Sequence, residues 1–182
     1  MEVLNDLLGY KNIKIYQNTQ MFSFSLDSVL LANFVNINKK VSNILDIGTG
    51  NAPIPLILSQ KTDAKITENV KLNESVYKRY ARHEITLNIE QIFKIARKLL
   101  KNNGSINIVH RPDRLVEILS IMKQNNIEPK RLKFIYPRIN ESANMVLIEG
   151  VKMGKSGVKV DSPLIVHDKD GNYTEDVKCF FS

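Results

Sequence analysis

The sequence predicts an α/β fold built largely on parallel strands, and three observations carry that prediction. First, "ILDIGTGNAPIPL" (44–56) places an apolar strand directly before a glycine turn and a helix. Second, strand-like and helix-like segments alternate along most of the chain, which is typical of parallel sheets with crossover helices. Third, two strand-like segments separated by the polar "NES" predict an antiparallel pair near the C-terminus.

Residues 1–40 are expected to form an N-terminal cap segment. A short amphipathic start leads into "IKIYQ" (13–17), whose alternation of apolar and polar residues predicts a strand. Ser25 is a favourable N-cap for a helix with an apolar stripe between Leu26 and Phe34. This segment therefore ends in a helix that leads towards the glycine turn.

The first βαβ unit is expected at 43–66. "ILDI" predicts a fully buried strand, "APIPLILSQ" predicts a helix with prolines in its first turn, and "AKI" (64–66) begins the next strand. After Ile66 the pattern stops, because "TENVKLNESVYKRYARHE" is polar and follows neither a strand nor a helix period.

Regular patterning returns at Asn88, which is expected to cap a helix with Gln91 at the capping-box position and Gly104 at its end. The remaining elements are expected in this order: a strand at 105–110, a helix over 111–126 with Pro112 in its first turn, an antiparallel pair at 131–139 and 144–152, and a mostly irregular tail over 153–182.

Charge, cysteine content and the length of the apolar runs indicate what kind of partner and location to expect for the protein. The formal net charge of +7 and the sequence pI near 9.4 favour a polyanionic partner such as nucleic acid, although a basic surplus can also simply aid solubility. A single cysteine, Cys179, excludes an internal disulfide and argues against a cysteine-based metal site. No apolar run approaches the ~20 residues of a membrane span, and the N-terminus lacks a secretory pattern. We therefore expect a cytoplasmic protein without a metal.

The glycine turn is chemically informative because an acid precedes it. Gly48 and Gly50 fit the start of a dinucleotide fingerprint, but Pro53 stands where the third glycine would be. Asp46, at the end of the strand, would repel a bound phosphate and attract a cation. S-adenosylmethionine carries a sulfonium and an ammonium and no phosphate, and Asn51 could hydrogen-bond it. The alternative is a tight strand–helix connection that binds nothing.

"LDIGTGNAPIPL" resembles motif I of class I S-adenosylmethionine-dependent methyltransferases. Four further stretches resemble the valine-tRNA adenine N(6)-methyltransferase family: residues 17–35, 81–104, 108–119 and 128–160. The resemblance implies a Rossmann-like domain over 1–182, with the C-terminal half of the sheet in 81–152. It also implies methylation of the 6-amino group of the adenine just 3′ of the anticodon.

The resemblance also implies cofactor-lining residues. The turn would contribute Asp46, Gly48, Gly50 and Asn51, and a family stretch F-x-F-S-x-D would contribute Phe24, Ser25 and Asp27. Alternatively, Phe24 could pack in the core, and Asp27 could stabilise the start of a helix through its charge.

The chain departs from the family in its middle. None of its six prolines are adjacent, so the catalytic Asn-Pro-Pro-Tyr motif is absent. At roughly 30 residues for each βα unit, about 60 or more residues are missing near 66/67, among them the acid that would hold the ribose. Unseen residues, deliberate truncation and natural degeneration are the three explanations, and we favour the first. The catalytic residues cannot be named from this sequence.

Several basic and imidazole side chains are candidate RNA contacts. Those in "YKRYARHE" lie among tyrosines that could stack on bases, and those in "HRP" follow a strand at the edge where α/β ligands bind. The candidates are Arg82, His83, His110, Arg111, Lys130 and Arg131. Each group also has a purely structural alternative. Arg82 and His83 could lie in a solvated loop, His110 and Arg111 could make hydrogen bonds at a strand end, and Lys130 and Arg131 could protect an edge strand from pairing.

The sequence thus predicts a monomeric S-adenosylmethionine-dependent tRNA adenine methyltransferase. Two alternatives stay open: a protein glutamine-amide methyltransferase, and a cofactor- or RNA-binding module that lacks catalysis.

Overall fold

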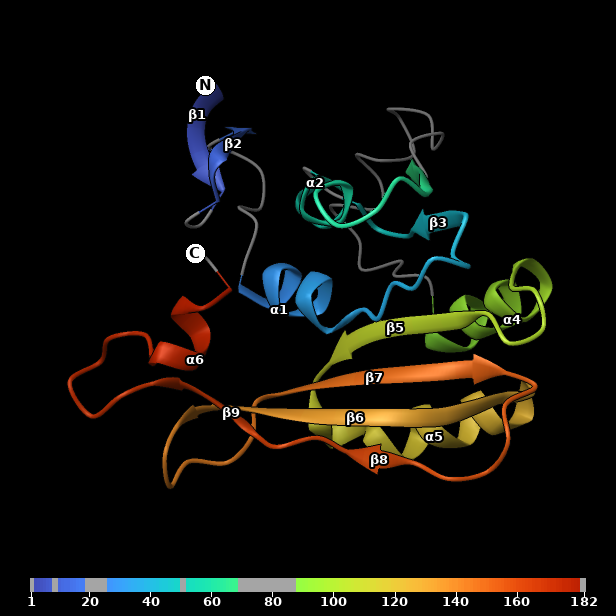
Figure 1. The fold of residues 1–182 in the computed structure, drawn as a ribbon. Coiled ribbons are helices and arrows are strands. Elements are labelled where there is room, and N and C mark those ends of the chain that lie inside the picture. The colour runs from blue at the N-terminus through green and yellow to red at the C-terminus, as the bar shows by residue number, and fades with distance from the viewer. Residues whose placement is uncertain (1, 8–9, 19–25, 50–51, 69–87, 181–182) are drawn as a thin grey trace. The chain divides into compact units, whose positions relative to one another are not determined.

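This computed structural model describes residues 2–7, 10–18, 26–49, 52–68 and 88–180 (Figure 1). The chain divides into two compact units, which are described separately. Unit 1 comprises Met1–Asn73 with Lys178–Ser182, and unit 2 comprises Glu74–Val177. The boundary falls in the polar stretch where the sequence pattern stops, and the expectation of a single domain stays a prediction.

Unit 1 holds a hairpin and a βαβ unit. Its elements are β1 Glu2–Leu7, β2 Tyr10–Asn18, α1 Leu26–Phe34, β3 Asn43–Asp46, α2 Pro53–Ser59 and β4 Lys65–Glu68. β1 and β2 pair antiparallel, whereas β3 and β4 pair parallel in the register that joins Asp46 to Glu68. The strand, helix and strand expected at 43–66 are therefore all present, and the N-terminal start is a strand.

The core of unit 1 gathers on one side of the βαβ unit. α1 and α2 pack together and bury Val29, Ala32, Ile57 and Leu58 almost completely. The expectation that β3 is fully buried is wrong, because Leu45 is 43% exposed. Strands of parallel sheets are normally covered on both faces by crossover helices. The described part of unit 1 supplies such cover for one face of β3.

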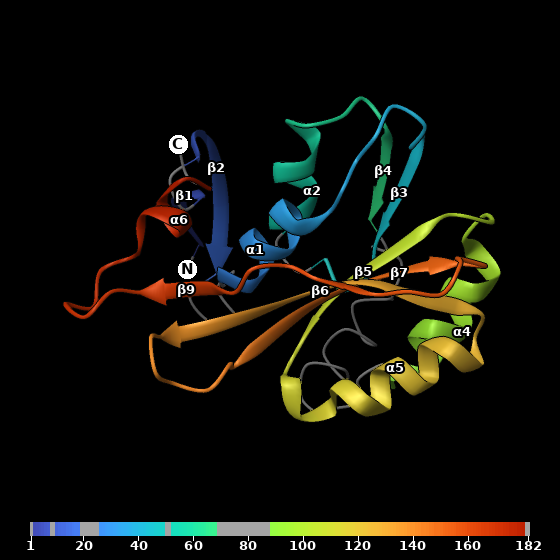
Figure 2. The ribbon, with the colours of Figure 1, turned by 60° about the horizontal axis from the view of Figure 1, so that its bottom comes forward.

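Unit 2 is a mixed sheet with two helices on one face (Figure 2). Its elements are α4 Ile89–Leu99, β5 Ser105–His110, the 3-10 turn η1 Pro112–Arg114, α5 Leu115–Gln124, β6 Ile127–Arg138, β7 Met145–Lys152, β8 Lys159–Val160, β9 Leu164–His167 and α6 Glu175–Lys178. The strand order is β5-β7-β6-β8, and β9 also pairs with β6. β7 is antiparallel to both neighbours, while β8 and β9 run parallel to β6.

The helix boundaries of unit 2 follow local chemistry. Glu90 N donates to Asn88 Oδ1 and Asn88 N donates to Gln91 Oε1, both at 3.2 Å, so the predicted capping box is confirmed. The predicted role of Gly104 as the helix end is wrong, since α4 ends at Leu99. Asn103 adopts the left-handed conformation (φ 65°) in the turn that follows.

The tail after β7 is mostly irregular, as expected, and contains three short elements, β8, β9 and α6. Leu164 and Val166 are buried at alternate positions of β9. This is a strand period, but four residues are too few to separate it from a loop by pattern alone. Across the described ranges, no helix has both the length and the apolar character to cross a bilayer.

Candidate functional site

The first candidate site is the turn between β3 and α2 in unit 1. β3 ends at Asp46, as the sequence predicts, and the chain then turns at Gly48 with φ +83°. Thr49 Oγ1 donates to Asp46 O at 3.3 Å and Ala52 N donates to Thr49 O at 2.8 Å, which closes the turn. α2 then begins at Pro53, with its prolines in the first turn as predicted.

The geometry at Gly48 fits close approach of a ligand. A left-handed φ of +83° is strained for any residue with a side chain. A Cβ built at Gly48 would meet no atom of the described chain within 4 Å, so the backbone is open on this side. The partly buried Asp46 lies two residues earlier. An acidic side chain beside an open backbone suits a cationic ligand that carries no phosphate.

The other cofactor candidates are only partly described. Phe24, Ser25, Gly50 and Asn51 lie outside the described residues. Asp27 is described, in the first turn of α1, where a carboxylate also favours the helix start. These assignments stay predictions.

One acidic residue that the sequence analysis did not consider is a further candidate for the cofactor site. We expected the ribose-holding acid to be absent from this chain, yet β4 ends at Glu68, whose backbone pairs with Asp46 across the parallel sheet. Dinucleotide-binding folds place such an acid about 20 residues after the first glycine of the turn. The spacing from Gly48 to Glu68 meets that rule and could have identified this residue.

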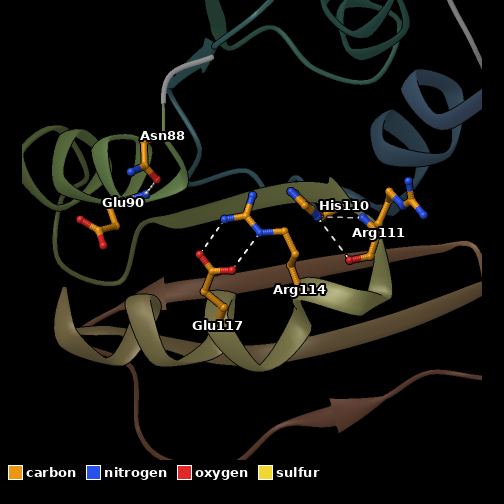
Figure 3. Close-up of polar contacts among 6 residues, drawn as sticks. All are labelled: Asn88, Glu90, His110, Arg111, Arg114 and Glu117. Atoms are coloured by element: carbon orange, nitrogen blue, oxygen red, sulfur yellow. Dashed lines mark hydrogen bonds and ion pairs between the residues drawn. The ribbon is translucent and has the colours of Figure 1, made fainter. Parts of the chain in front are cut away.

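The second candidate site lies at the carboxyl end of β5 in unit 2 (Figure 3). Arg111 N donates to His110 Nδ1 at 2.8 Å, and the same ring nitrogen lies 3.3 Å from Arg111 O. The Arg111 side chain is 81% exposed and lies 3.7 Å from Asp113. The His110 ring is thus held against the backbone of Arg111, and the Arg111 side chain presents a charge that solvent or a polyanion can reach.

A second arginine in this region is held by an ion pair. Arg114 Nε and a terminal guanidinium nitrogen donate to the two carboxylate oxygens of Glu117, at 2.8 and 2.6 Å (Figure 3). The hydrogen bonds from Arg114 hold the pKa of Glu117 below its usual value, and Glu117 in turn raises the pKa of Arg114. This bidentate pair lies at the start of α5, between its N-cap residue and its first turn.

The structure does not bring the two described groups of RNA candidates together. His110 pairs with Val146 of β7, while Arg131 pairs with Glu149, and two strand spacings, roughly 10 Å, also separate β5 from β6. Arg131 Nε lies 3.0 Å from Glu149 Oε2, and Lys130 Nζ donates to two backbone carbonyls of residues 155–157. Arg131 thus links the neighbouring strands β6 and β7, and Lys130 links β6 to the segment after β7.

Arg82 and His83 lie outside the described residues.

Comparison with solved structures defines the class of fold. The chain is similar to a predicted O-methyltransferase from Agrobacterium tumefaciens, with a TM-score of 0.67 and 18% identity, over 85% of this chain and 95% of that one. It is also similar to a hemolysin candidate from Lactococcus lactis, with a TM-score of 0.50 and 15% identity, over 75% of this chain and 93% of that one. The predicted α/β, methyltransferase-like fold class is therefore confirmed.

Two curated relatives are similar to part of this chain. A tRNA1(Val) (adenine(37)-N6)-methyltransferase of Christiangramia forsetii is 32% identical over 73 residues, 40% of this chain. The protein of the same name from Flavobacterium psychrophilum is 31% identical over 71 residues, 39% of this chain. In each case the match spans 30% of the relative's length. No family model matches the chain. These relatives support the resemblance to this family of methyltransferases.

Proposed function

We propose that this chain is an S-adenosylmethionine-dependent methyltransferase that acts on the 6-amino group of an adenine in tRNA. The observation that carries the proposal is the similarity of about 32% over 73 residues to tRNA1(Val) (adenine(37)-N6)-methyltransferases, in a chain with a methyltransferase-like fold. The proposed substrate is accordingly valine tRNA, at the base 3′ of the anticodon. On this proposal the protein works in the cytoplasm as a monomer.

The turn after β3 would hold the cofactor. Asp46 would attract its cationic methionine end, and the open backbone at Gly48 would allow close approach. Gly50 and Asn51 would complete the turn, and Glu68 at the end of β4 would hold the ribose hydroxyls. Bound S-adenosylmethionine would supply an electrophilic methyl group on its sulfonium.

The segment before α1 would cover the methionine end of the cofactor, with Phe24, Ser25 and Asp27 as its proposed contacts.

The protein's part in the reaction would be binding and positioning. A base inside a helical stack is out of reach of an active site, so the target adenine would have to leave its stack. The amine would then need to point its lone pair at the methyl carbon while water is excluded. His110 and Arg111, at the carboxyl end of β5, are placed where α/β folds bind ligands and would contact the RNA.

A second candidate is a binding module that lacks catalysis, and a specific observation favours it. Only residues 69–88 separate β4 from α4, whereas a single βα unit takes roughly 30 residues. The exposed Leu45 on β3 is also consistent with a sheet that lacks part of its usual cover. Such a module would bind the cofactor or RNA and would transfer no methyl group.

Calorimetric titration of S-adenosylmethionine tests the cofactor site. We expect the wild-type chain to bind it, and Asp46→Asn to weaken binding by about 10-fold, which is about 1.4 kcal/mol, because a neutral amide attracts a cation less. Asp63→Asn removes an equal charge from an exposed position outside the turn and should leave binding unchanged. Absence of binding by the wild type, or equal binding by Asp46→Asn, would overturn the assignment of this turn.

A further inference from the structure

The outer face of α4 is strongly basic. Lys94, Arg97 and Lys98 recur at helical spacing on its exposed side, and Lys101 follows directly after the helix end. We call these four residues the α4 basic face. Glu90 is the one acidic residue within α4, and it lies 3.5 Å from Lys94 at a site where both side chains are more than half exposed. Exposed ion pairs of this kind contribute little free energy, so Lys94 can leave Glu90 for another anionic partner.

Three of the four residues of the α4 basic face differ from most other cations of unit 2 because their side chains have no partner among the described residues. Most other described arginines and lysines there are tied by carboxylates or carbonyls, for example Arg114 by Glu117 and Arg131 by Glu149. Within the described residues, Arg97, Lys98 and Lys101 take part in no side-chain ion pair or hydrogen bond. Three neighbouring exposed cations thus remain available to a partner.

A lysine from β7 occupies the end of α4 and adds a further positive charge there. The last carbonyls of a helix carry partial negative charge, which would draw nearby cations inwards. Here Lys152 of β7 already occupies that position, donating to Arg97 O at 2.6 Å and Leu100 O at 2.8 Å. The side chains of the α4 basic face are therefore left pointing their charge to solvent.

The opposite face of α4 excludes a membrane role for the helix. Ile89, Phe93 and Ala96 are 7% exposed or less and pack in the core with residues of α5 and the sheet. A helix that lies in a membrane surface must insert its apolar face. Because the apolar face of α4 is used in the core, only the two exposed residues Ile95 and Leu99 remain for lipid.

We propose that the α4 basic face binds the phosphate backbone of RNA. This inference rests on the proposed function, in which tRNA is the substrate and therefore the polyanion to be bound. It extends the RNA-contacting surface to a helix that the sequence analysis did not consider. Cations at i, i+3 and i+4 present a row of charge of the kind that contacts successive phosphates without reading bases. The face would position the tRNA, and base selection would lie elsewhere.

The test measures how RNA affinity depends on salt. Fluorescence anisotropy with a labelled valine tRNA transcript, between 50 and 200 mM KCl, compares wild type with Arg97→Gln/Lys98→Gln/Lys101→Gln. Each phosphate contact contributes about 0.7–0.9 to the slope of log affinity against log salt. We expect the triple variant to lose about 2 from that slope, so that between 50 and 200 mM KCl the RNA affinity of the wild type falls by a factor about 16-fold larger than that of the variant. Glutamine has a helix propensity close to that of lysine, so α4 should persist.

The matched control is Lys39→Gln/Lys40→Gln/Lys169→Gln, which removes the same charge from three exposed positions in turns. It should leave most of the slope in place. If the α4 variant proves unstable, the three single substitutions should each lower the slope by about 0.7. An α4 variant with the slope of the wild type or of the control overturns the inference. So does a wild type that binds phosphatidylserine vesicles but not the transcript.

Methyl transfer, measured on the same proteins, separates this inference from the proposed function. A chain whose RNA affinity depends on the α4 basic face but that transfers no methyl group would refute the proposed catalysis alone. A chain that methylates tRNA with a salt slope independent of α4 would refute the inference alone.

Discussion

Gly150 lies in the central strand of the unit 2 sheet and leaves the space that α5 needs. A Cβ built at this position would lie 2.2 Å from Met122 Cε and 2.7 Å from Ile127 Cγ2, far inside van der Waals contact. Both neighbours are fully buried. Met122 can move its flexible end, but Ile127 is β-branched and stiff. Overpacking of this kind costs typically about 1–3 kcal/mol, so Gly150→Ala should destabilise the protein by that amount.

Urea unfolding followed by circular dichroism would measure the effect. With a slope of about 1–3 kcal/mol/M, the midpoint should fall by about 1 M. The matched variant is Met122→Ala, which removes the side chain that the new methyl group would strike. In a double-mutant cycle, Gly150→Ala should cost about 1 kcal/mol less in the Met122→Ala background than in the wild type. An unchanged midpoint for Gly150→Ala, or strict additivity of the two changes, would refute this account of the core.

Three further predictions concern the ends of the unit 2 helices. Lys152→Met should cost about 1–3 kcal/mol of unfolding free energy, because two carbonyls at the end of α4 lose a charged donor, whereas Lys155→Met should be nearly neutral in the same urea assay. Asn88→Ala should cost about 1 kcal/mol through loss of the capping box, and a smaller thermal shift than Asn102→Ala would contradict it. NMR titration of Glu117 should give a pKa below that of an ordinary glutamate, which rises in Arg114→Gln. Because this pKa is lowered in the folded state, the stability that the pair contributes is present above the ordinary glutamate pKa and is lost as the pH falls through the lowered value. A Glu117 pKa that is equal in the wild type and in Arg114→Gln would count against the ion pair.

Local chemistry made much of the fold predictable. The capping box at Asn88, the helical prolines after the glycine turn and the short polar connection between β6 and β7 each determine backbone structure through neighbours in sequence. The same holds for the turn after β9, where Asp168 Oδ1 accepts from two backbone N–H groups at 2.9 Å.

What was not predicted depends on contacts distant in sequence. β8 is two residues long and exists because it pairs with β6, which no local pattern of "KV" encodes. Leu45 reads as a buried strand residue, and its exposure depends on which other elements cover the sheet.

The candidate site was predictable only in part, for a related reason. Asp46 and Gly48 carry a local signal that the structure places in one turn. The spacing of Glu68 from Gly48 is a signal in the sequence, and the structure adds that β4 pairs with β3 so that Glu68 lies opposite Asp46 in the register. The sequence shows that Arg131 is positively charged, but only the structure shows that it forms an ion pair with Glu149 on the neighbouring strand.

The most direct test of the proposed function is methyl transfer itself. The purified chain would be incubated with deuterated-methyl S-adenosylmethionine and a valine tRNA transcript, and the digested nucleosides would be analysed by mass spectrometry. A transcript with guanine in place of the adenine 3′ of the anticodon is the control. The proposed function predicts labelled N6-methyladenosine from the first transcript and none from the second. If neither transcript yields labelled N6-methyladenosine while the chain still binds S-adenosylmethionine or tRNA, the proposed catalysis is contradicted and the chain is a binding module.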